Sequence, residues 1–223
     1  MSTNKIIMLV GAILVVIGLG IWLTSTPTVE APKSQIPTEQ ITPTPEQGIP
    51  VPPKSTTTNI NNTKIMNAIL HTTKGDITIK FTPDATPKTV ANFIKLAQEG
   101  FYNNTKFHRV IKGFMNQGGD PLSKDDSQAA LWGTGDPGYK FDDEITSQNK
   151  NVTGSISMAN SGPNTNGSQF FINAADNNFL DTKHTVFGNV IEGLDVVMAI
   201  NSVATDAQDR PIEPVAIKSI TLK

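Results

Sequence analysis

The sequence of 223 residues predicts a mostly β domain that follows an apolar N-terminal stretch and a proline-rich segment. Residues 64–223 carry many short apolar runs of strand length but only two helical patterns. Strands and helices do not alternate there, which excludes a doubly wound parallel sheet. We therefore divide the chain into residues 1–23, 24–63 and 64–223.

The first element is an uncharged apolar stretch of 18 residues, Ile6–Leu23. As a helix it would be about 27 Å long, close to the hydrocarbon thickness of a bilayer. The stretch is longer than the apolar core of a signal peptide, about 7–15 residues, and no clear cleavage site follows it. Residues 1–23 are predicted to form a single-pass transmembrane helix, with a cleaved signal peptide and a secreted domain as the alternative.

The orientation of this anchor is predicted from its flanking charge. Lys5 and the free amino terminus precede the apolar stretch, and positive charge favours the cytoplasmic side. Residues 64–223 are then expected to face away from the cytoplasm.

Residues 24–63 form the second element, a proline-rich segment. Eight of the chain's 15 prolines fall here, interleaved with Thr and Ser. Such a composition lacks the apolar side chains of a core and favours extended polyproline II. We predict a disordered, flexible linker that reaches about 120 Å when extended.

Residues 64–223 contain the predicted strands, which are rich in β-branched and aromatic residues and bounded by turn residues. The first two are joined by Thr72–Gly75 and are expected to form a hairpin. The strands are predicted over Met66–His71, Asp76–Phe81, Lys106–Gln117, Gly154–Met158, Gln169–Asn173, His184–Val190 and Val215–Leu222.

Two helices complete the domain. Thr86 is expected to cap the first helix, with Pro87 at its first position and Gly100 at its end. The side chains that line its apolar face are Val90, Phe93, Ile94 and Ala97. The second helix is predicted over Leu194–Asn201.

Composition excludes several classes of function. The chain has no Cys, so neither a disulfide framework nor a Cys-ligated metal site can form. Residues 64–223 hold 15 Lys and Arg against 17 Asp and Glu, which is not the basic surface of a nucleic-acid binder. The sequence shows neither a nucleophile–histidine pair nor clustered metal ligands, so we expect no metal and no cofactor.

Three dense runs carry the chemistry: residues 107–121, 157–172 and 179–188. The first places a single arginine, Arg109, in a mostly apolar strand, where its charge is costly unless it faces a groove and binds something there. Strand alternation puts Met115 and Gln117 on the same face as Arg109. By the same rule Gln169 and Phe171 share a face, whereas Phe170 and Ile172 point to the core.

These runs resemble the cyclophilin family of peptidyl-prolyl cis/trans isomerases, and the resemblance covers about residues 65–223. It implies a closed eight-stranded antiparallel β-barrel, capped by two α-helices, with the active groove on the outer surface. It also implies that proline-containing polypeptides are the substrates and that no cofactor takes part.

The resemblance assigns the site residue by residue. It makes Arg109 the catalytic arginine and groups Phe114, Gln117 and His184 with it. It assigns substrate binding to Met115, Ala159, Asn160, Gln169, Phe171, Phe179 and Leu180. Phe179 stands where the family often has Trp, and Phe lacks the indole N–H donor, so we expect weak cyclosporin binding.

The chemistry of proline isomerisation suits these side chains. Rotation about an X–Pro bond breaks amide resonance, over a barrier of about 18–20 kcal/mol, but makes and cleaves no covalent bond. A site that binds the twisted amide more tightly than the planar amide lowers this barrier. A fixed guanidinium can donate to the prolyl nitrogen as it regains its lone pair, and an apolar pocket can hold the ring.

We therefore expect a monomeric, membrane-anchored isomerase that assists the folding of extracytoplasmic proteins. The alternative is a scaffold at the membrane that binds proline-containing segments without catalysis. A third interpretation is self-recognition, in which the groove binds Gly–Pro and Val–Pro sites of the linker.

Overall fold

The computed structural model describes residues 65–223. The predicted anchor and linker lie outside these residues. Within residues 65–223, no helix is both long and apolar enough to cross a membrane.

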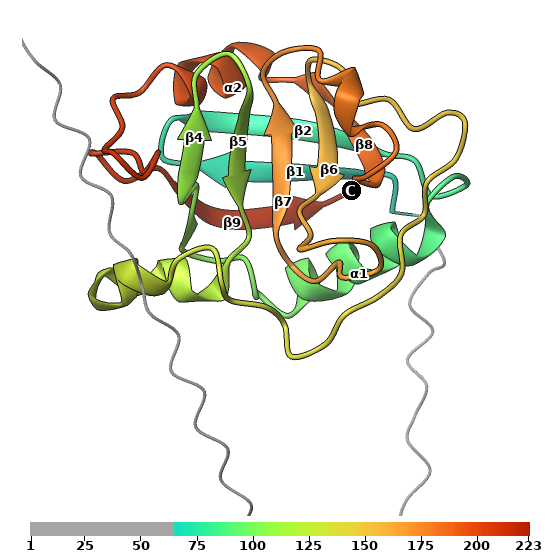
Figure 1. Cartoon of the computed structure of the whole chain (residues 1–223), viewed down its shortest axis with the longest axis horizontal. Coiled ribbons are helices and arrows are strands. Elements are labelled where there is room, and N and C mark those ends of the chain that lie inside the picture. The colour runs from blue at the N-terminus through green and yellow to red at the C-terminus, as the bar shows by residue number, and fades with distance from the viewer. Residues whose placement is uncertain (1–64) are drawn as a thin grey trace, which may run out of the picture. The chain divides into compact units, whose positions relative to one another are not determined.

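One antiparallel sheet organises the described residues, and its nine strands follow the order β3-β9-β1-β2-β8-β6-β7-β5-β4. The sheet curls so that β4, β5, β7 and β6 lie across β1, β2 and β9 (Figure 1). The strands are β1 Asn67–Thr72, β2 Gly75–Phe81, β3 Thr105–Lys106, β4 Arg109–Ile111, β5 Met115–Gly118, β6 Ser155–Met158, β7 Phe170–Asn173, β8 Val186–Glu192 and β9 Ala216–Leu222.

Helices cover two ends of the curled sheet. Helix α1, Pro87–Gln98, lies at the lower end in the view of Figure 1, and α2, Leu194–Asn201, lies at the upper end. Within residues 65–223, three short 3-10 helices occur in the connections, at Pro121–Lys124, Asp126–Leu131 and Asn178–Leu180.

The predicted strand Lys106–Gln117 is wrong as a single element. The structure divides it among β3, β4 and β5, and β4 and β5 form a hairpin. Gly113 in the turn has φ +72°, a left-handed conformation that glycine adopts without strain. This division gives nine strands where the resemblance implied eight. β3 and β4 stand at the two ends of the strand order and are joined through Phe107 and His108.

The other predicted elements agree with the structure to within two residues at each end. The Thr72–Gly75 connection forms the expected hairpin, because Thr72 pairs with Gly75 across β1 and β2. Helix α2 has the predicted bounds. Gly100 follows α1 with φ +66°, as expected for a residue that ends a helix.

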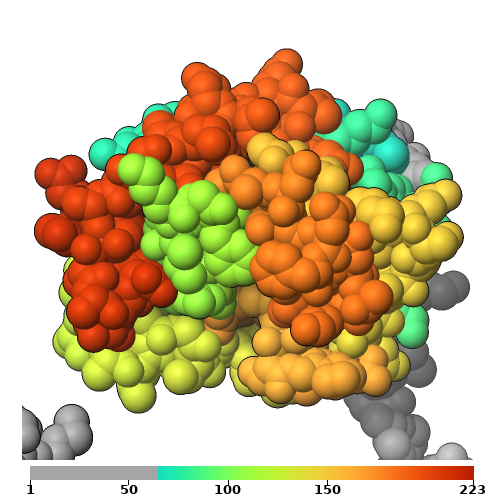
Figure 2. Space-filling model, turned by 45° about the horizontal axis from the view of Figure 1, so that its top comes forward, coloured from blue at the N-terminus to red at the C-terminus, as the bar shows by residue number. Residues whose placement is uncertain are grey.

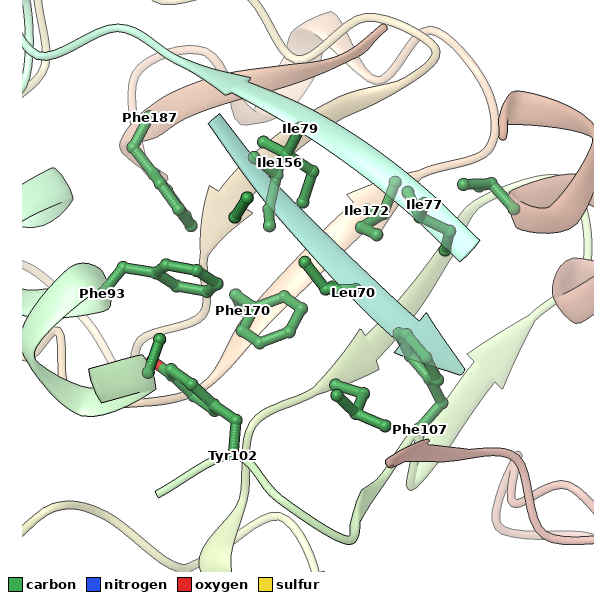
Figure 3. Close-up of a cluster of buried hydrophobic side chains, with 14 of the residues drawn as sticks. Leu70, Ile77, Ile79, Phe93, Tyr102, Phe107, Ile156, Phe170, Ile172 and Phe187 are labelled. Atoms are coloured by element: carbon green, nitrogen blue, oxygen red, sulfur yellow. The ribbon is translucent and has the colours of Figure 1, made fainter. Parts of the chain in front are cut away.

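Phe93 extends from α1 into the buried cluster and faces Phe170 and Tyr102 (Figure 3). Its ring centroid lies 4.9 Å from that of Tyr102, 5.4 Å from that of Phe187 and 5.6 Å from that of Phe170. Phe170 and Ile172 are fully buried there, as strand alternation predicted. The helix is therefore fixed to the sheet by aromatic packing, which is worth several kcal/mol at such a site.

The start of α1 corrects one prediction. Thr86 does occupy the N-cap position, but its side chain makes no capping hydrogen bond and instead donates to the Thr82 carbonyl oxygen at 3.2 Å. The carboxylate of Glu144 accepts hydrogen bonds from the backbone N–H groups of Lys88 at 3.0 Å and Thr89 at 2.8 Å. A negative charge there also interacts favourably with the helix dipole.

We predict that Glu144→Ala lowers the free energy of unfolding by about 1–2 kcal/mol, the cost of losing a helix cap. Urea denaturation followed by far-ultraviolet circular dichroism measures this loss. Glu144→Gln keeps one acceptor oxygen and is expected to lose less. Equal stability of the alanine variant and the wild type would contradict the capping role.

Candidate active site

The β4–β5 hairpin sets the positions of the predicted site residues on the outer face of the sheet. Arg109 pairs with Gln117, and Ile111 pairs with Met115. Paired residues share a face, so Arg109, Met115 and Gln117 lie together, as strand alternation predicted. Val110 lies on the opposite face, in the core.

The neighbouring strand extends this row. Gln117 of β5 pairs with Phe171 of β7, so Arg109, Gln117 and Phe171 follow one another across three adjacent strands. In Figure 2 the green hairpin is flanked on one side by orange segments and on the other by a red segment that follows α2. A cation, an amide and an aromatic ring are thereby aligned on a rigid sheet.

A pocket of about 220 Å³ opens over this row. Nine of the eleven residues that the sequence assigned to the site line it: Arg109, Phe114, Met115, Gln117, Ala159, Asn160, Phe171, Leu180 and His184. The remaining two, Gln169 and Phe179, contact residues that line it. The structure thus brings residues from three separate runs of the sequence to one place.

The polar side of the pocket is a hydrogen-bonded series. Arg109 Nη1 lies 3.4 Å from Gln117 Oε1, and Gln117 Nε2 donates to Gln169 Oε1 at 3.0 Å. Gln169 Nε2 in turn donates to the carbonyl oxygens of Gly133 and Gly135, at 3.0 and 2.8 Å. Gln169 therefore fixes the orientation of the Gln117 amide from outside the pocket.

The apolar side is a separate buried cluster of Met115, Phe171 and Leu180, against which Phe114 and Ala159 pack. Phe179 stacks on Phe114 with ring centroids 5.9 Å apart and is 65% exposed. It therefore lies at the rim. This apolar floor can receive a small ring, and the guanidinium stands beside it.

His184 and Asn160 form another part of the wall. His184 Nδ1 lies 2.9 Å from the carbonyl oxygen of Met158, which can only accept, so Nδ1 carries the proton. The imidazole contacts the Phe171 ring edge to face, with centroids 5.3 Å apart. Asn160 Nδ2 donates to the Lys183 carbonyl oxygen at 2.9 Å, and this bond connects the segment that holds Asn160 to the segment that holds His184.

Comparison with known proteins identifies the family. The family model described as cyclophilin type peptidyl-prolyl cis-trans isomerase/CLD matches residues 68–222. The chain belongs to the cyclophilin family. Its curled, mostly β structure is the cyclophilin-like fold.

Curated and solved relatives agree with this assignment. Peptidyl-prolyl cis-trans isomerase CYP71 of Arabidopsis thaliana is 48% identical over 157 residues, which are 70% of this chain and 24% of that protein. Peptidyl-prolyl cis-trans isomerase ppi1 of Schizosaccharomyces pombe is 46% identical over 158 residues, 70% of this chain and 99% of that protein. The chain therefore spans about a quarter of its larger relatives and nearly all of its smaller ones.

A solved structure also matches. The crystal structure of a cyclophilin type isomerase from Cryptosporidium parvum, in the presence of the dipeptide Ala-Pro, has a TM-score of 0.65 and 35% sequence identity. The match covers 70% of this chain and 98% of that chain.

Buried asparagines, which sequence reasoning missed, fix the backbone of the cyclophilin pocket. Asn201 at the end of α2 accepts a hydrogen bond from Gly113 N at 2.8 Å and donates to Ile111 O at 2.9 Å and to Asn116 Oδ1 at 2.8 Å. These bonds hold the β4–β5 turn from behind. No local sequence pattern identifies the role of Asn201. A polar residue at the end of an apolar helix is common and does not by itself indicate a buried hydrogen-bonding position.

A second asparagine holds the other side of the same turn. Asn177 Nδ2 donates to the Phe114 carbonyl oxygen at 3.0 Å, and Ala174 N donates to the same oxygen at 2.9 Å. Asn177 also donates to Asn173 Oδ1 at 2.7 Å, within β7. The backbone of Phe114 is therefore fixed to the strand that carries Phe171.

His108 is buried next to Arg109 and outside the pocket. Burial lowers the pKa of His108, and the nearby Asp120 carboxylate opposes this shift. A neutral imidazole at neutral pH adds no charge beside the guanidinium. Among residues 65–223, no group of three or more His, Cys, Asp or Glu side chains could hold a metal ion.

We predict that Asn201→Ala lowers the free energy of unfolding by about 2–4 kcal/mol, because it leaves Oδ1 of the buried Asn116 without its donor and removes the bonds that fix the β4–β5 turn. Urea denaturation of the full chain measures the loss. Ser202→Ala, at the exposed neighbouring position, is the matched control and is expected to change stability by less than about 0.5 kcal/mol. An Asn201→Ala variant as stable as this control would show that the turn does not depend on the asparagine.

Proposed function

We propose that the chain is a peptidyl-prolyl cis/trans isomerase that accelerates rotation about X–Pro bonds in polypeptides. The observation that carries the proposal is the single guanidinium of Arg109 at the edge of an apolar pocket formed by Met115, Phe171 and Leu180. The names of the relatives support it, as does the related crystal structure in the presence of Ala-Pro.

The apolar cluster holds the proline ring and excludes water from the prolyl nitrogen. Water stabilises the planar, polar amide, so its exclusion favours the twisted state. Gln117 and Asn160 line the pocket and can supply amide donors and acceptors to a substrate backbone. Binding of this kind is shared by the planar and twisted amides and sets affinity more than rate.

Arg109 supplies the differential interaction. The planar prolyl nitrogen has no available lone pair, whereas the twisted nitrogen accepts a hydrogen bond. A guanidinium donor therefore stabilises the twisted state only. Each 1.4 kcal/mol of such selective stabilisation accelerates rotation about tenfold.

We predict that Arg109→Ala lowers kcat/KM about 100-fold, the typical effect of removing one transition-state donor. Arg109→Lys keeps the charge but not the planar array of donors, and is expected to lose most of the activity. Exchange spectroscopy of an Ala–Pro peptide measures both. Lys112→Ala, an exposed cation three residues along the same hairpin, is the matched control and should retain full activity.

Exchange spectroscopy of the Ala–Pro peptide with the wild type also distinguishes an enzyme from a non-catalytic scaffold. If the wild type binds the peptide but does not accelerate its cis/trans exchange, the isomerase proposal is refuted and the non-catalytic scaffold is favoured. If a peptide of residues 24–63 is added in place of the Ala–Pro peptide, changes in the NMR chemical shifts of residues 64–223 would favour self-recognition.

We further propose that a single membrane helix tethers the domain outside the cytoplasm, where it assists the folding of extracytoplasmic proteins. The support is the uncharged stretch Ile6–Leu23, preceded by Lys5. The proline-rich residues 24–63 then give the domain reach to emerging chains near the membrane. Release of a secreted domain after cleavage is the alternative.

We predict that a topology reporter fused after Lys223 is active only outside the cytoplasm and fractionates with the membrane. Val15→Arg with Val16→Arg places two charges at the centre of the apolar stretch, at about 2.5–3.5 kcal/mol each, and should release the protein from the membrane. Thr24→Arg, at the edge, is the control and should stay bound. A cytoplasmic reporter signal would refute the orientation, and a new N-terminus after residue 23 would establish cleavage.

A further inference from the structure

Residues 204–212 follow α2 and form a loop that is stabilised by internal hydrogen bonds. Ile212 N donates to Ala204 O at 2.9 Å, and Asp206 N donates to Arg210 O at 2.8 Å. The carboxylate of Asp206 accepts hydrogen bonds from Gln208 N and Arg210 N, at 2.8 and 2.9 Å. Backbone and side chain thus stabilise one conformation of this 204–212 loop.

The loop packs against the sheet at the strand that carries Arg109. β4 is the last strand of the sheet and pairs only with β5 in the described strand order. Val110 N of β4 donates to Asp209 O at 2.7 Å, so the loop satisfies an N–H group on the outer edge of β4. The red loop lies directly beside β4 in Figure 1 and beside the green hairpin in Figure 2.

This contact brings a carboxylate to the guanidinium. Asp209 has φ +62°, a left-handed conformation that Asp and Asn tolerate better than most residues. Asp209 Oδ2 lies 3.6 Å from Arg109 Nε, and the two side chains are 44% and 45% exposed. On the other side of the guanidinium, Gln117 Oε1 lies 3.4 Å from Nη1.

The guanidinium therefore has an ion-pair contact at Nε and a long hydrogen bond at Nη1, and its remaining N–H groups are left for a ligand in the pocket. An arginine side chain has about 2 kcal/mol of rotamer entropy to lose when it is fixed. A residue that fixes the arginine side chain before the substrate binds lowers the entropy that the side chain loses during rotation of the X–Pro bond.

We infer that Asp209 is a positioning residue for Arg109, and that the 204–212 loop sets the guanidinium in the orientation that meets the twisted prolyl nitrogen. The inference rests on the proposed isomerase activity. Asp209 lies outside the set of pocket-lining residues, so its effect on the reaction passes through Arg109.

The test is Asp209→Asn in the full chain, with kcat and KM measured separately for an Ala–Pro peptide. Asparagine keeps the left-handed backbone preference and an acceptor oxygen, but it removes the charge. We expect kcat to fall about three- to fivefold, the effect of an exposed ion pair, with KM unchanged, because only the twisted state uses the ordered donor. Glu213→Gln removes an 88% exposed carboxylate nearby and should leave kcat unchanged.

Ionic strength gives a second readout that a purely structural role would not change. Salt screens exposed ion pairs, so kcat of the wild type should fall as salt rises to about 1 M. The Asp209→Asn variant should show little dependence on salt. A salt response that is the same in both proteins overturns the inference.

The outcomes separate this inference from the proposed function. If the wild type is active and the Asp209→Asn variant is equally active or faster, only the positioning role is overturned. A faster variant would show that the negative charge of Asp209 weakens the interaction of the guanidinium with the substrate. A wild type that does not accelerate exchange overturns the proposed function and the inference together. A rise in KM with unchanged kcat also overturns the inference, since it assigns Asp209 to ground-state binding.

Discussion

The side chain of Asn201 is the constraint on which the rest of the site depends. It reaches from the end of α2 into the β4–β5 turn and makes hydrogen bonds with both arms of the hairpin. A two-stranded hairpin is marginally stable by itself, so its position must be set by its neighbours. Because the hairpin carries Arg109, Phe114 and Met115, this buried amide, together with Asn177 and the pairing of β5 with β7, fixes where the guanidinium and the apolar pocket lie.

The site keeps its apolar part separate from the core of the domain. The cluster of Met115, Phe171 and Leu180 lies on the outer face of β5 and β7, whereas Phe170 and Ile172 join the large cluster around Phe93 on the inner face. The alternation of strand residues thus serves stability on one face and binding on the other. Substitutions in the pocket can therefore alter activity without opening the core.

The outer edge of β4 has both a structural and a functional consequence. An uncovered edge strand presents unpaired backbone groups and invites association with other chains. The 204–212 loop covers this edge through Val110, and the same contact places Asp209 beside Arg109. Edge protection and the orientation of the guanidinium are thereby provided by one loop, and its tight internal hydrogen bonding suits both.

The sequence by itself predicted the family, most of the strands, both α-helices and nine of the residues that line the pocket. Period-two patterns, turn residues and three dense motifs are local, and they are read directly from residues that lie close together in the chain. Only the tertiary structure decided which distant groups complete the site and its supports: Glu144 at the start of α1, Asn201 behind the turn and Asp209 beside Arg109. Each of these contacts joins residues more than 50 positions apart, or about 100 for Asp209 and Arg109. Such contacts depend on how the sheet curls and how its edges are covered, and no local pattern of apolar and polar residues specifies them.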